Sequence, residues 1–386
     1  MAEMERIPLA DNPVGKTLLL VTLGMLALGV VMVHSAVASV VEPGAWYARV
    51  DFRHTAFAVL ACLVLLVLWR LDYRLFLRGK AVPAIPALLL AVSLLCGALV
   101  FVPGLGRSVG GDYRWIRIGP SRYSIGFQPS ELIKPTLVIF LAAWLSRKSA
   151  QEIGSFRKTL LPAGVLVALC AGLVATQDFG TAVVICLASG AALLLAGVPL
   201  WQLAMLVPPA AAGFYVLVVR EPHRWARITA MLDPWAYANP STYQPRNSLL
   251  AILNGGWFGR GVGQGIYKLG FLPEDSTDFI FSVYCEEFGC IGALLLMGLI
   301  LIWIYSARKA AMRADDGFGR LLAGSLGFLI AVQAVLHLSV NLVVAPPTGM
   351  SLPFISAGGT ALVIMAATTA MLVSVTARGR PEPARG

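Results

Sequence analysis

Long apolar stretches alternate with polar connections along most of the chain. A helix needs about 20 apolar residues to cross the hydrocarbon core of a bilayer, and ten stretches approach or reach that length. The fourth stretch is short, so we expect its helix to begin inside the preceding polar segment. The pattern predicts an all-α integral membrane protein of about ten transmembrane helices, folded as a single polytopic domain over 1–386. The predicted spans are 17–38, 54–69, 82–102, 132–145, 160–176, 181–196, 200–219, 279–305, 321–344 and 354–375.

Two polar segments are too long to be simple connections. One covers 103–131, and the other covers 220–278 between the seventh and eighth predicted helices. Long ordered loops are usually functional, and both segments are rich in Gly, Pro, Trp, Arg and Asp. The short polar segments 177–180 and 346–353 should lie on the same face. We therefore expect any chemistry on that face, at the boundary between membrane and water.

The charges support a membrane protein and give its orientation. Only 13% of the residues are charged, against about 25% in soluble domains, and 58% are hydrophobic. The net charge of +10 would suggest nucleic acid for a soluble protein, but here Lys and Arg cluster at the ends of apolar runs, so we expect no nucleic-acid partner. With the N-terminus in the cytoplasm, 17 of the 30 basic and 8 of the 20 acidic residues fall on that side. The positive-inside rule then predicts that both short terminal tails are cytoplasmic and both long loops extracytoplasmic.

Asp278 is the strongest candidate for chemistry. It lies where the long polar loop gives way to an apolar helix, so partial desolvation would raise its pKa towards that of a useful general base. The alternative is structural, because Asp is a favoured N-cap residue. Thr277 could serve as the cap instead, which leaves both interpretations open.

Other charged residues fall inside predicted spans. Glu286 and Glu287 are two turns into the eighth helix, where acids are usually functional; we expect them to pair with a cation such as Lys134 or to bind a metal. Glu131 and Lys134 are spaced i, i+3 on one helix face, so they either neutralise each other or hold a phosphate. Six Cys without a CxxC pair and four His make a His/Cys metal cluster improbable.

Aromatic and basic residues of the two long loops suit a lipid-linked phosphate. Trp115 lies beside Arg117, and it either anchors the loop in lipid or stacks on a sugar ring or lipid stem. The cations of the larger loop either are solvated surface charges or bind a pyrophosphate. They are Arg224, Arg227, Arg246, Arg260 and Lys268. The glycine-rich string 255–265 lacks the elements of a nucleotide loop and predicts either close backbone approach or a tight re-entrant path instead.

Five motifs, in order over nearly the whole chain, resemble those of the SEDS (FtsW/RodA) family. They are QPSELIK at 128–134, QDFGTA at 177–182, the loop strings YQ at 243–244 and GGWFG at 255–259, LPE with TDFIF at 272–281, and LPFISAGGT at 352–360. Some positions depart from the family pattern: Ala357 replaces the usual Tyr, Thr360 replaces Ser, and His337 stands where Asn is common, although Asn341 fits. Lys268 and the pair Gly263-Gln264 favour the FtsW-like branch.

The resemblance implies a peptidoglycan glycosyltransferase that polymerises lipid II at the outer face of the bacterial cytoplasmic (inner) membrane, with inversion at the sugar. It implies Asp278 as the essential loop aspartate and a class B penicillin-binding protein, a transpeptidase, as partner. A lipid II flippase or a non-catalytic scaffold of the division or elongation machinery are the alternatives. The sequence demands no cofactor and leaves open a divalent cation, Mg²⁺ or Mn²⁺. The substrate-binding candidates are Trp115, Arg117, Gln128, Ser130, Glu131, Lys134, Arg224, Arg227, Lys268, Glu286 and Ser356.

Overall fold

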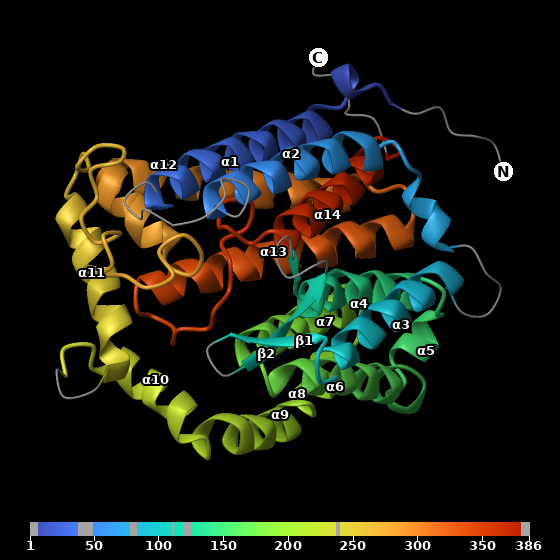
Figure 1. The fold of residues 1–386 in the computed structure, drawn as a ribbon. Coiled ribbons are helices and arrows are strands. Elements are labelled where there is room, and N and C mark those ends of the chain that lie inside the picture. The colour runs from blue at the N-terminus through green and yellow to red at the C-terminus, as the bar shows by residue number, and fades with distance from the viewer. Residues whose placement is uncertain are drawn as a thin grey trace.

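The computed structural model describes residues 7–37, 49–77, 83–109, 112–118, 125–236 and 240–379. It is a bundle of helices in two groups, with α13 between them (Figure 1). The first group holds α1 (Pro13–Val37), α2 (Val50–Leu68), α12 (Ile280–Arg313), α13 (Gly317–Asn341) and α14 (Thr360–Thr376). The second group holds α3 (Ala84–Leu99), α4 (Pro129–Leu145), α6 (Leu161–Ala175) and α7 (Phe179–Ala196). Contacts of α13 with both α12 and α7 join the two groups.

Short helices complete the chain between these elements. The fifth predicted span begins with a π-helical turn, Phe156–Leu160, that continues into α6, and the seventh consists of three joined pieces. Those pieces are α8 (Leu200–Ala204), α9 (Val207–Phe214) and the π-helical η5 (Tyr215–Val219). Three more short helices are η1 (Leu9–Asp11), η3 (Tyr73–Leu77) and α5 (Ala150–Ile153).

The helical membrane-protein class is confirmed. Seven helices in the described part of the chain are long and apolar enough to cross a membrane, and α3 and α14 are shorter apolar helices. Each of the ten predicted spans coincides with a helical segment, and α4 begins at Pro129, inside the preceding polar segment as expected. Because α4 is 17 residues long and carries Glu131 and Lys134, the count of ten spans stays a prediction.

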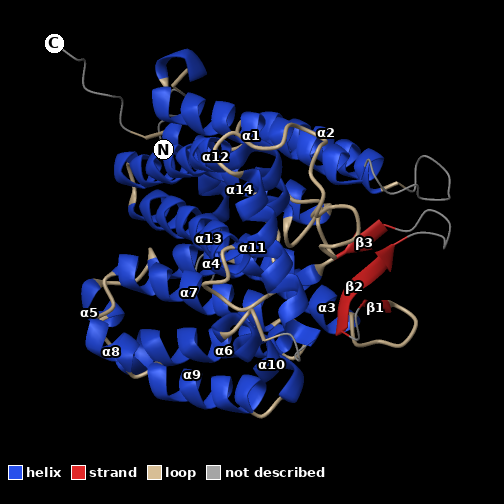
Figure 2. Ribbon diagram, turned by 90° about the vertical axis from the view of Figure 1, so that its left-hand side faces the viewer, coloured by secondary structure: helices blue, strands red, loops and turns tan. Residues whose placement is uncertain are grey.

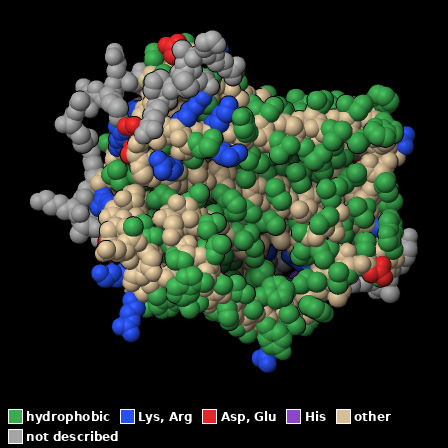
Figure 3. All heavy atoms as spheres, turned by 180° about the vertical axis from the view of Figure 1, so that it is seen from behind, with side chains coloured by type: hydrophobic (Ala, Val, Ile, Leu, Met, Phe, Trp, Pro, Cys, Tyr) green, Lys and Arg blue, Asp and Glu red, His purple; other side chains and the backbone are tan. Residues whose placement is uncertain are grey.

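The helix surfaces fit a lipid environment. Figure 3 shows one face of the molecule, where hydrophobic side chains cover most of the surface and most of the visible Lys and Arg lie towards one end. Small residues let helices approach closely, as is usual in membrane bundles. A Cβ on Gly327 of α13 would lie 2.9 Å from the Cβ of Ala307 in α12, and one on Gly29 of α1 would lie 2.8 Å from the carbonyl oxygen of Ile355.

The first long loop contains a small antiparallel sheet that the sequence did not predict. Its strands are β1 (Gly106–Val109), β2 (Asp112–Ile118) and β3 (Ile125–Phe127), in the order β1-β2-β3. The strands are short, and the pairing of β1 with β2 is irregular after Arg107, so they carry little periodic signal. Figure 2 shows the sheet at the end of the bundle away from the two termini.

The second long loop folds along one end of the bundle. It forms α10 (Pro222–Leu232), η6 (Pro240–Thr242) and α11 (Tyr243–Gly255), which lead from α9 on one side to α12 on the other (Figure 1). A turn-rich segment, 256–279, then returns to the start of α12.

A break in α12 receives the glycine-rich string. Gly289 adopts φ 68° and ψ −168° inside the helix, which frees backbone groups on both sides of it. The amide of Cys290 donates to the carbonyl of Gly256 at 2.9 Å, and the amide of Gly261 donates to the carbonyl of Glu287 at 3.0 Å. A Cβ on Gly255 would lie 2.0 Å from the carbonyl oxygen of Cys285. The predicted close backbone approach is confirmed.

Candidate active site

Asp278 lies at the end of the turn-rich segment, two residues before α12, and is partly buried. It faces Gly349, whose φ of +70° suits glycine. A Cβ built on Gly349 would lie 3.0 Å from Nη1 of Arg114 and 3.7 Å from Oδ2 of Asp278. The glycine therefore leaves room between the carboxylate and the guanidinium.

The N-cap of α12 is not Asp278. The cap position is Phe279, and its side chain makes no capping hydrogen bond. The side chain of Asn341, at the end of α13, takes that place, because its Oδ1 accepts the amide N–H of Ser282 at 3.1 Å. Thr277 is not the cap either, since its hydroxyl donates to the Glu274 carboxylate at 3.0 Å. The structural interpretation of Asp278 as a helix cap is wrong.

The surroundings of Asp278 adjust its acidity. Burial raises the pKa of the Asp278 carboxyl to about 7, and the negative charges of Glu274 and Asp178 act in the same direction. Arg114 and Arg227 oppose that rise, because positive charge lowers the pKa of a nearby carboxyl. A pKa near 7 matches the carboxyl to general-base catalysis at neutral pH.

A cavity of ≈ 460 Å³ is lined by three arginines, Arg114, Arg224 and Arg227. Asp278 is not part of the lining, but Arg114 and Arg227 lie close enough to it for their charges to lower the pKa of its carboxyl. Arg224 donates to the carbonyl of Thr176 at 2.6 Å, and Arg227 donates to that of Pro347 at 3.4 Å. The cavity walls come from β2, α10, η5 and the two short segments predicted to share this face, 177–180 and 346–353, of which the second contributes residues 346–348. The convergence of both long loops with these segments is confirmed.

The rest of the cavity wall is mainly apolar. The apolar part comes from the start of α7 and from α9 and η5, and it comprises Phe179, Phe214, Val216, Leu217 and Val218. The cavity therefore combines three guanidinium groups with an apolar wall, and Glu221 and His223 complete its polar lining. This combination suits a ligand with an anionic head and an apolar stem.

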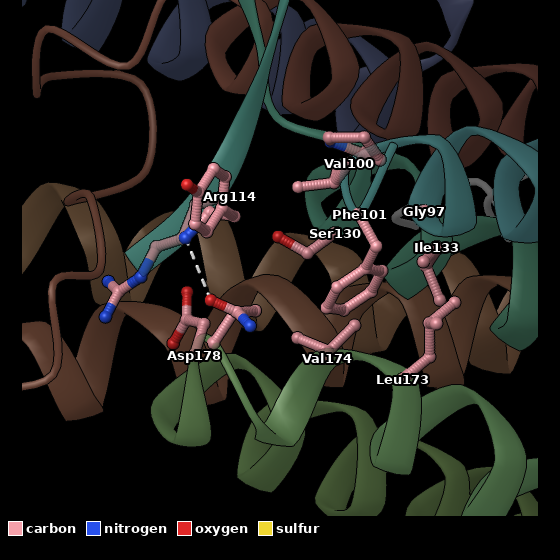
Figure 4. Close-up of a pocket in the computed structure, with 12 residues that line it drawn as sticks. Gly97, Val100, Phe101, Arg114, Ser130, Ile133, Leu173, Val174 and Asp178 are labelled. Atoms are coloured by element: carbon pink, nitrogen blue, oxygen red, sulfur yellow. Dashed lines mark hydrogen bonds between the residues drawn. The ribbon is translucent and has the colours of Figure 1, made fainter. Parts of the chain in front are cut away.

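A smaller pocket, of ≈ 30 Å³, lies beneath β2 between α3, α4 and α6. Figure 4 shows Ser130 among its lining residues, with Arg114 and Asp178 at one side. The amide of Tyr113 donates to Oε1 of Gln177 at 2.9 Å, the contact that is dashed in Figure 4. Arg114 and Gln177 line both pockets and therefore join them.

The QPSELIK motif, at the start of α4, contacts the helices that surround the site. Glu131 and Lys134 are buried and form an ion pair at 2.8 Å, and the Lys134 ammonium also donates to Gln333 of α13 at 2.7 Å. Of the two alternatives for this pair, mutual neutralisation is what the structure shows. Gln128 lies 3.5 Å from Asp178, whose carboxylate caps α7. The motif therefore ties α4 to α7 and α13.

The expected pairing of Glu286 and Glu287 with Lys134 is wrong, because Lys134 is already paired within α4. Glu287 accepts instead from Lys268 at 2.6 Å, and both side chains are buried. Glu286 accepts from Asn254 at 2.7 Å and from two loop amides. Among the described residues, no three His, Cys, Asp or Glu side chains are grouped to hold a metal. Glu286, Glu287 and Lys268 fasten the large loop to α12.

Three further candidates lie apart from the cavity wall. Ser356 is buried, and its hydroxyl donates to the carbonyl of Thr277 at 2.8 Å. The Trp115 ring packs over Gly126 of β3, where a Cβ would approach it to 3.1 Å. Arg117 pairs with Gly126 through the backbone of β2, and its side chain falls outside the described residues.

Sequence reasoning missed Arg114 and Glu274. Arg114 immediately precedes Trp115, and this neighbourhood was a signal that it belongs to the site. Glu274 is the last residue of the LPE string, but its effect on the pKa of Asp278 depends on the turn that brings the two together and could not be read from that string.

The fold and site define a polytopic helical membrane protein in which a carboxyl of raised pKa lies near two of the arginines that line a partly apolar cavity. The chain belongs to the FtsW/RodA/SpoVE family, since the model of that family, described as a cell cycle protein, matches residues 16–380. The resemblance seen in the motifs is thereby confirmed.

Curated relatives and solved structures agree with this assignment. A probable peptidoglycan glycosyltransferase FtsW from Nitrosococcus halophilus is 36% identical over 369 residues, covering 94% of this chain and 92% of the relative. A probable peptidoglycan glycosyltransferase FtsW from Aliivibrio salmonicida is 34% identical and covers 93% of this chain and 88% of the relative. Rod shape determining protein RodA from Thermus thermophilus matches with TM-score 0.64 and 25% identity over 93% of this chain and 95% of its own. A chain from the structure of a peptidoglycan synthase complex matches with TM-score 0.71 and 26% identity over 93% of this chain and 96% of its own.

Proposed function

We propose that this chain is a peptidoglycan glycosyltransferase that joins lipid II units into glycan strands at the outer face of the bacterial cytoplasmic membrane. Both termini then lie in the cytoplasm, and the two long loops lie outside. The names of the curated relatives support the activity. The observation that carries the proposal is Asp278, a carboxyl with its pKa raised to about 7, which faces Arg114 across Gly349. Arg114 and Arg227 act on this carboxyl and also line the cavity.

The proposed reaction begins with Asp278. Its carboxylate takes the proton from a hydroxyl of the acceptor sugar, and the oxygen attacks the anomeric carbon of the donor. The new glycosidic bond forms as the bond to the pyrophosphate oxygen breaks, and the polyprenyl pyrophosphate leaves with that electron pair. Attack from the opposite face inverts the configuration at this carbon.

The arginine-lined cavity suits the donor. Arg114, Arg224 and Arg227 place positive charge where the pyrophosphate charge would grow, and such preorganised charge often provides the largest stabilisation of a transition state. The apolar wall would receive the first part of the polyprenyl stem. Mg²⁺ or Mn²⁺ carried in by the pyrophosphate would add to the same stabilisation, which assays with and without a chelator would test.

The proposed partner is a class B penicillin-binding protein. The similar chain from a peptidoglycan synthase complex supports a partner of this kind. The FtsW names of the relatives favour the division branch. The protein should copurify with a single-span transpeptidase and gain activity from it, and activity that every such partner leaves unchanged would argue against the pairing.

The deciding experiment incubates purified protein, with and without the partner, with lipid II and resolves glycan strands on a gel. Asp278→Asn keeps the size of the side chain but removes the base, so polymerisation should fall by about 10²–10⁴-fold. The variant should melt like the wild type, because Asn341 and not Asp278 caps α12. Near wild-type polymerisation by Asp278→Asn would end the assignment of the base. A wild type that makes no glycan with any partner would favour a flippase or a scaffold.

A further inference from the structure

Three consecutive backbone carbonyls lead up to α12, and each accepts a hydrogen bond from a different donor. The carbonyl of Ser276 accepts from the amide of Ala357 at 2.9 Å. That of Thr277 accepts from the hydroxyl of Ser356 at 2.8 Å, and that of Asp278 from Nδ2 of Asn341 at 2.9 Å. We name these donors, the side chains of Asn341 and Ser356 and the amide of Ala357, the carbonyl clamp.

Asn341 is held in a single orientation. Its Oδ1 accepts from the amide of Ser282 at 3.1 Å and from the hydroxyl of Ser282 at 2.8 Å. Its Nδ2 donates to the carbonyls of Asp278 and His337, each at 2.9 Å. Because a backbone N–H requires an acceptor and the carbonyls require a donor, the two ends of the amide cannot be exchanged. The residue is fully buried, so water does not compete for these bonds.

Ser356 is held in the same manner. Its hydroxyl oxygen accepts the amide N–H of Leu352 at 2.7 Å while the hydroxyl donates to Thr277. The residue is 1% exposed. The hydroxyl is therefore occupied inside the protein, which gives the LPFISAGGT motif a task other than contact with substrate.

Backbone strain is concentrated around the clamp. Among the described residues, the non-glycine positions with positive φ are Glu274, Val343 and Phe354, at 59°, 57° and 67°. They lie four residues before Asp278, two after Asn341 and two before Ser356. Such backbone is unfavourable for a β-branched or bulky residue, and it persists where the surrounding structure enforces it, often at functional sites.

We propose that Asn341 and Ser356 are positioning residues that hold the backbone of Asp278 so that its carboxylate meets the acceptor hydroxyl. The inference rests on the proposed function, since it requires Asp278 to be the base. Every hydrogen bond that the clamp donates goes to a backbone carbonyl, so it sets the place of the Asp278 carboxylate and leaves the cavity arginines untouched. A displacement of about 1 Å at a reacting group can reduce a rate by about 10²-fold.

The test measures kcat and KM for lipid II in Asn341→Ala and Ser356→Ala. Both variants should lose about 10²-fold in kcat with an unchanged KM, because donor binding does not depend on the clamp. Ser306→Ala is the matched control: its buried hydroxyl donates to the carbonyl of Ile302 on the same helix, away from the site, and kcat should stay at the wild-type value. Asn341→Asp keeps the acceptor for Ser282 and loses the donor to Asp278. If the alanine variants do not fold, kcat and KM of Asn341→Asp test the clamp instead.

The outcomes separate the clamp from the base. If Asp278→Asn is inactive while Asn341→Asp and Ser356→Ala keep kcat within about twofold of the wild type, only the clamp is wrong. A fall in kcat and a rise in KM together with a lower melting temperature would mean a merely structural role and would also overturn it. If Asp278→Asn polymerises normally, the proposed base itself is wrong. In the Asp278→Asn background, clamp substitutions should reduce activity no further, because there is no base left to position.

Discussion

Glu274 and Asp278 are the two ends of one turn, in which the carbonyl of Glu274 accepts the amide N–H of Asp278 at 3.1 Å. The amides of Thr277 and Phe279 approach the same carbonyl at 3.2 Å. The turn holds two carboxylates within electrostatic range of each other, and the charge of Glu274 raises the pKa of Asp278. Glu274 thus helps to set the pH at which Asp278 can act as a base.

Activity should therefore depend on pH through Asp278. A base works only when it is deprotonated, so kcat/KM should fall by about tenfold per unit as the pH drops below about 7 and should level off above it. In Glu274→Gln a negative charge is lost, the carboxylate is easier to form, and the midpoint should move to lower pH. Rate profiles of both proteins against pH would show this. Superimposable profiles would mean that the charge of Glu274 does not set the pKa of the group on the acid limb, and a rate that does not fall below pH 7 would mean that Asp278 does not govern it.

The cavity arginines should matter for use of the donor. Arg227→Ala removes one of the three guanidinium groups that line the cavity, and we expect kcat/KM for lipid II to fall by about 10²-fold. Arg220→Ala is the matched control, since Arg220 lies over the Tyr215 ring at 5.7 Å and is not part of the cavity lining. Equal activity of the two folded variants at limiting lipid II would make Arg227 ordinary surface charge.

Membrane orientation can be tested with single cysteines in a background without native Cys. Pro240→Cys lies in the second long loop and Asp315→Cys in the connection between α12 and α13, and both positions are exposed. The positive-inside rule predicts that a membrane-impermeant thiol reagent labels the first in intact cells and leaves the second unlabelled. Equal labelling at both positions would contradict the proposed topology.

The sequence predicted most of the helices because an apolar run of bilayer length has few alternatives. It also predicted that the two long loops and the segment 346–353 share one face. The partners of the buried charges could not be read in this way. Whether Glu287 pairs with Lys134 or Lys268 depends on how segment 256–279 folds back against α12. The sequence alone does not distinguish the two lysines.

Hydrogen bonds to backbone groups could not be predicted from the sequence either, because tertiary folding decides which groups meet. The role of Ser356 follows from its contact with the Thr277 carbonyl, 79 positions away, and any residue can supply a carbonyl. The sheet of the first loop was missed because β3 has only three residues. Motifs located the region of the site, and tertiary contacts decided what each residue does there.

The break in α12 gives a prediction about stability. A Cβ on Gly289 would lie 2.3 Å from the amide nitrogen of Gly259, and its φ of 68° disfavours any side chain, so Gly289→Ala should lower the melting temperature and loosen the large loop. Gly298→Ala on the same helix is the control, because no atom lies within 4 Å of its Cβ position. Alanine there should be neutral or stabilise the helix by up to about 1 kcal/mol. Thermal melts in one detergent that show the same change for both would mean that the break is not required.

The buried pair of Lys268 and Glu287 gives the last prediction. Their charged atoms are 2.6 Å apart, and the Ser35 hydroxyl of α1 donates to the same carboxylate, so the pair joins the large loop to α1 and α12. Breaking such a pair leaves one buried charge without its partner, which typically costs about 3–5 kcal/mol. Lys268→Met should therefore destabilise the protein strongly.

Replacing both charges removes that penalty. In Lys268→Met combined with Glu287→Leu, two apolar side chains of similar size fill the space, and pairs replaced in this way are often neutral or more stable. We expect the double variant to recover most of the melting temperature lost by either single variant. Its polymerase activity should recover as well, because neither residue lines the arginine cavity. If the double variant melts normally and stays inactive, the charges themselves take part in the reaction. If both single variants already melt like the wild type, the pair does not hold the loop in place.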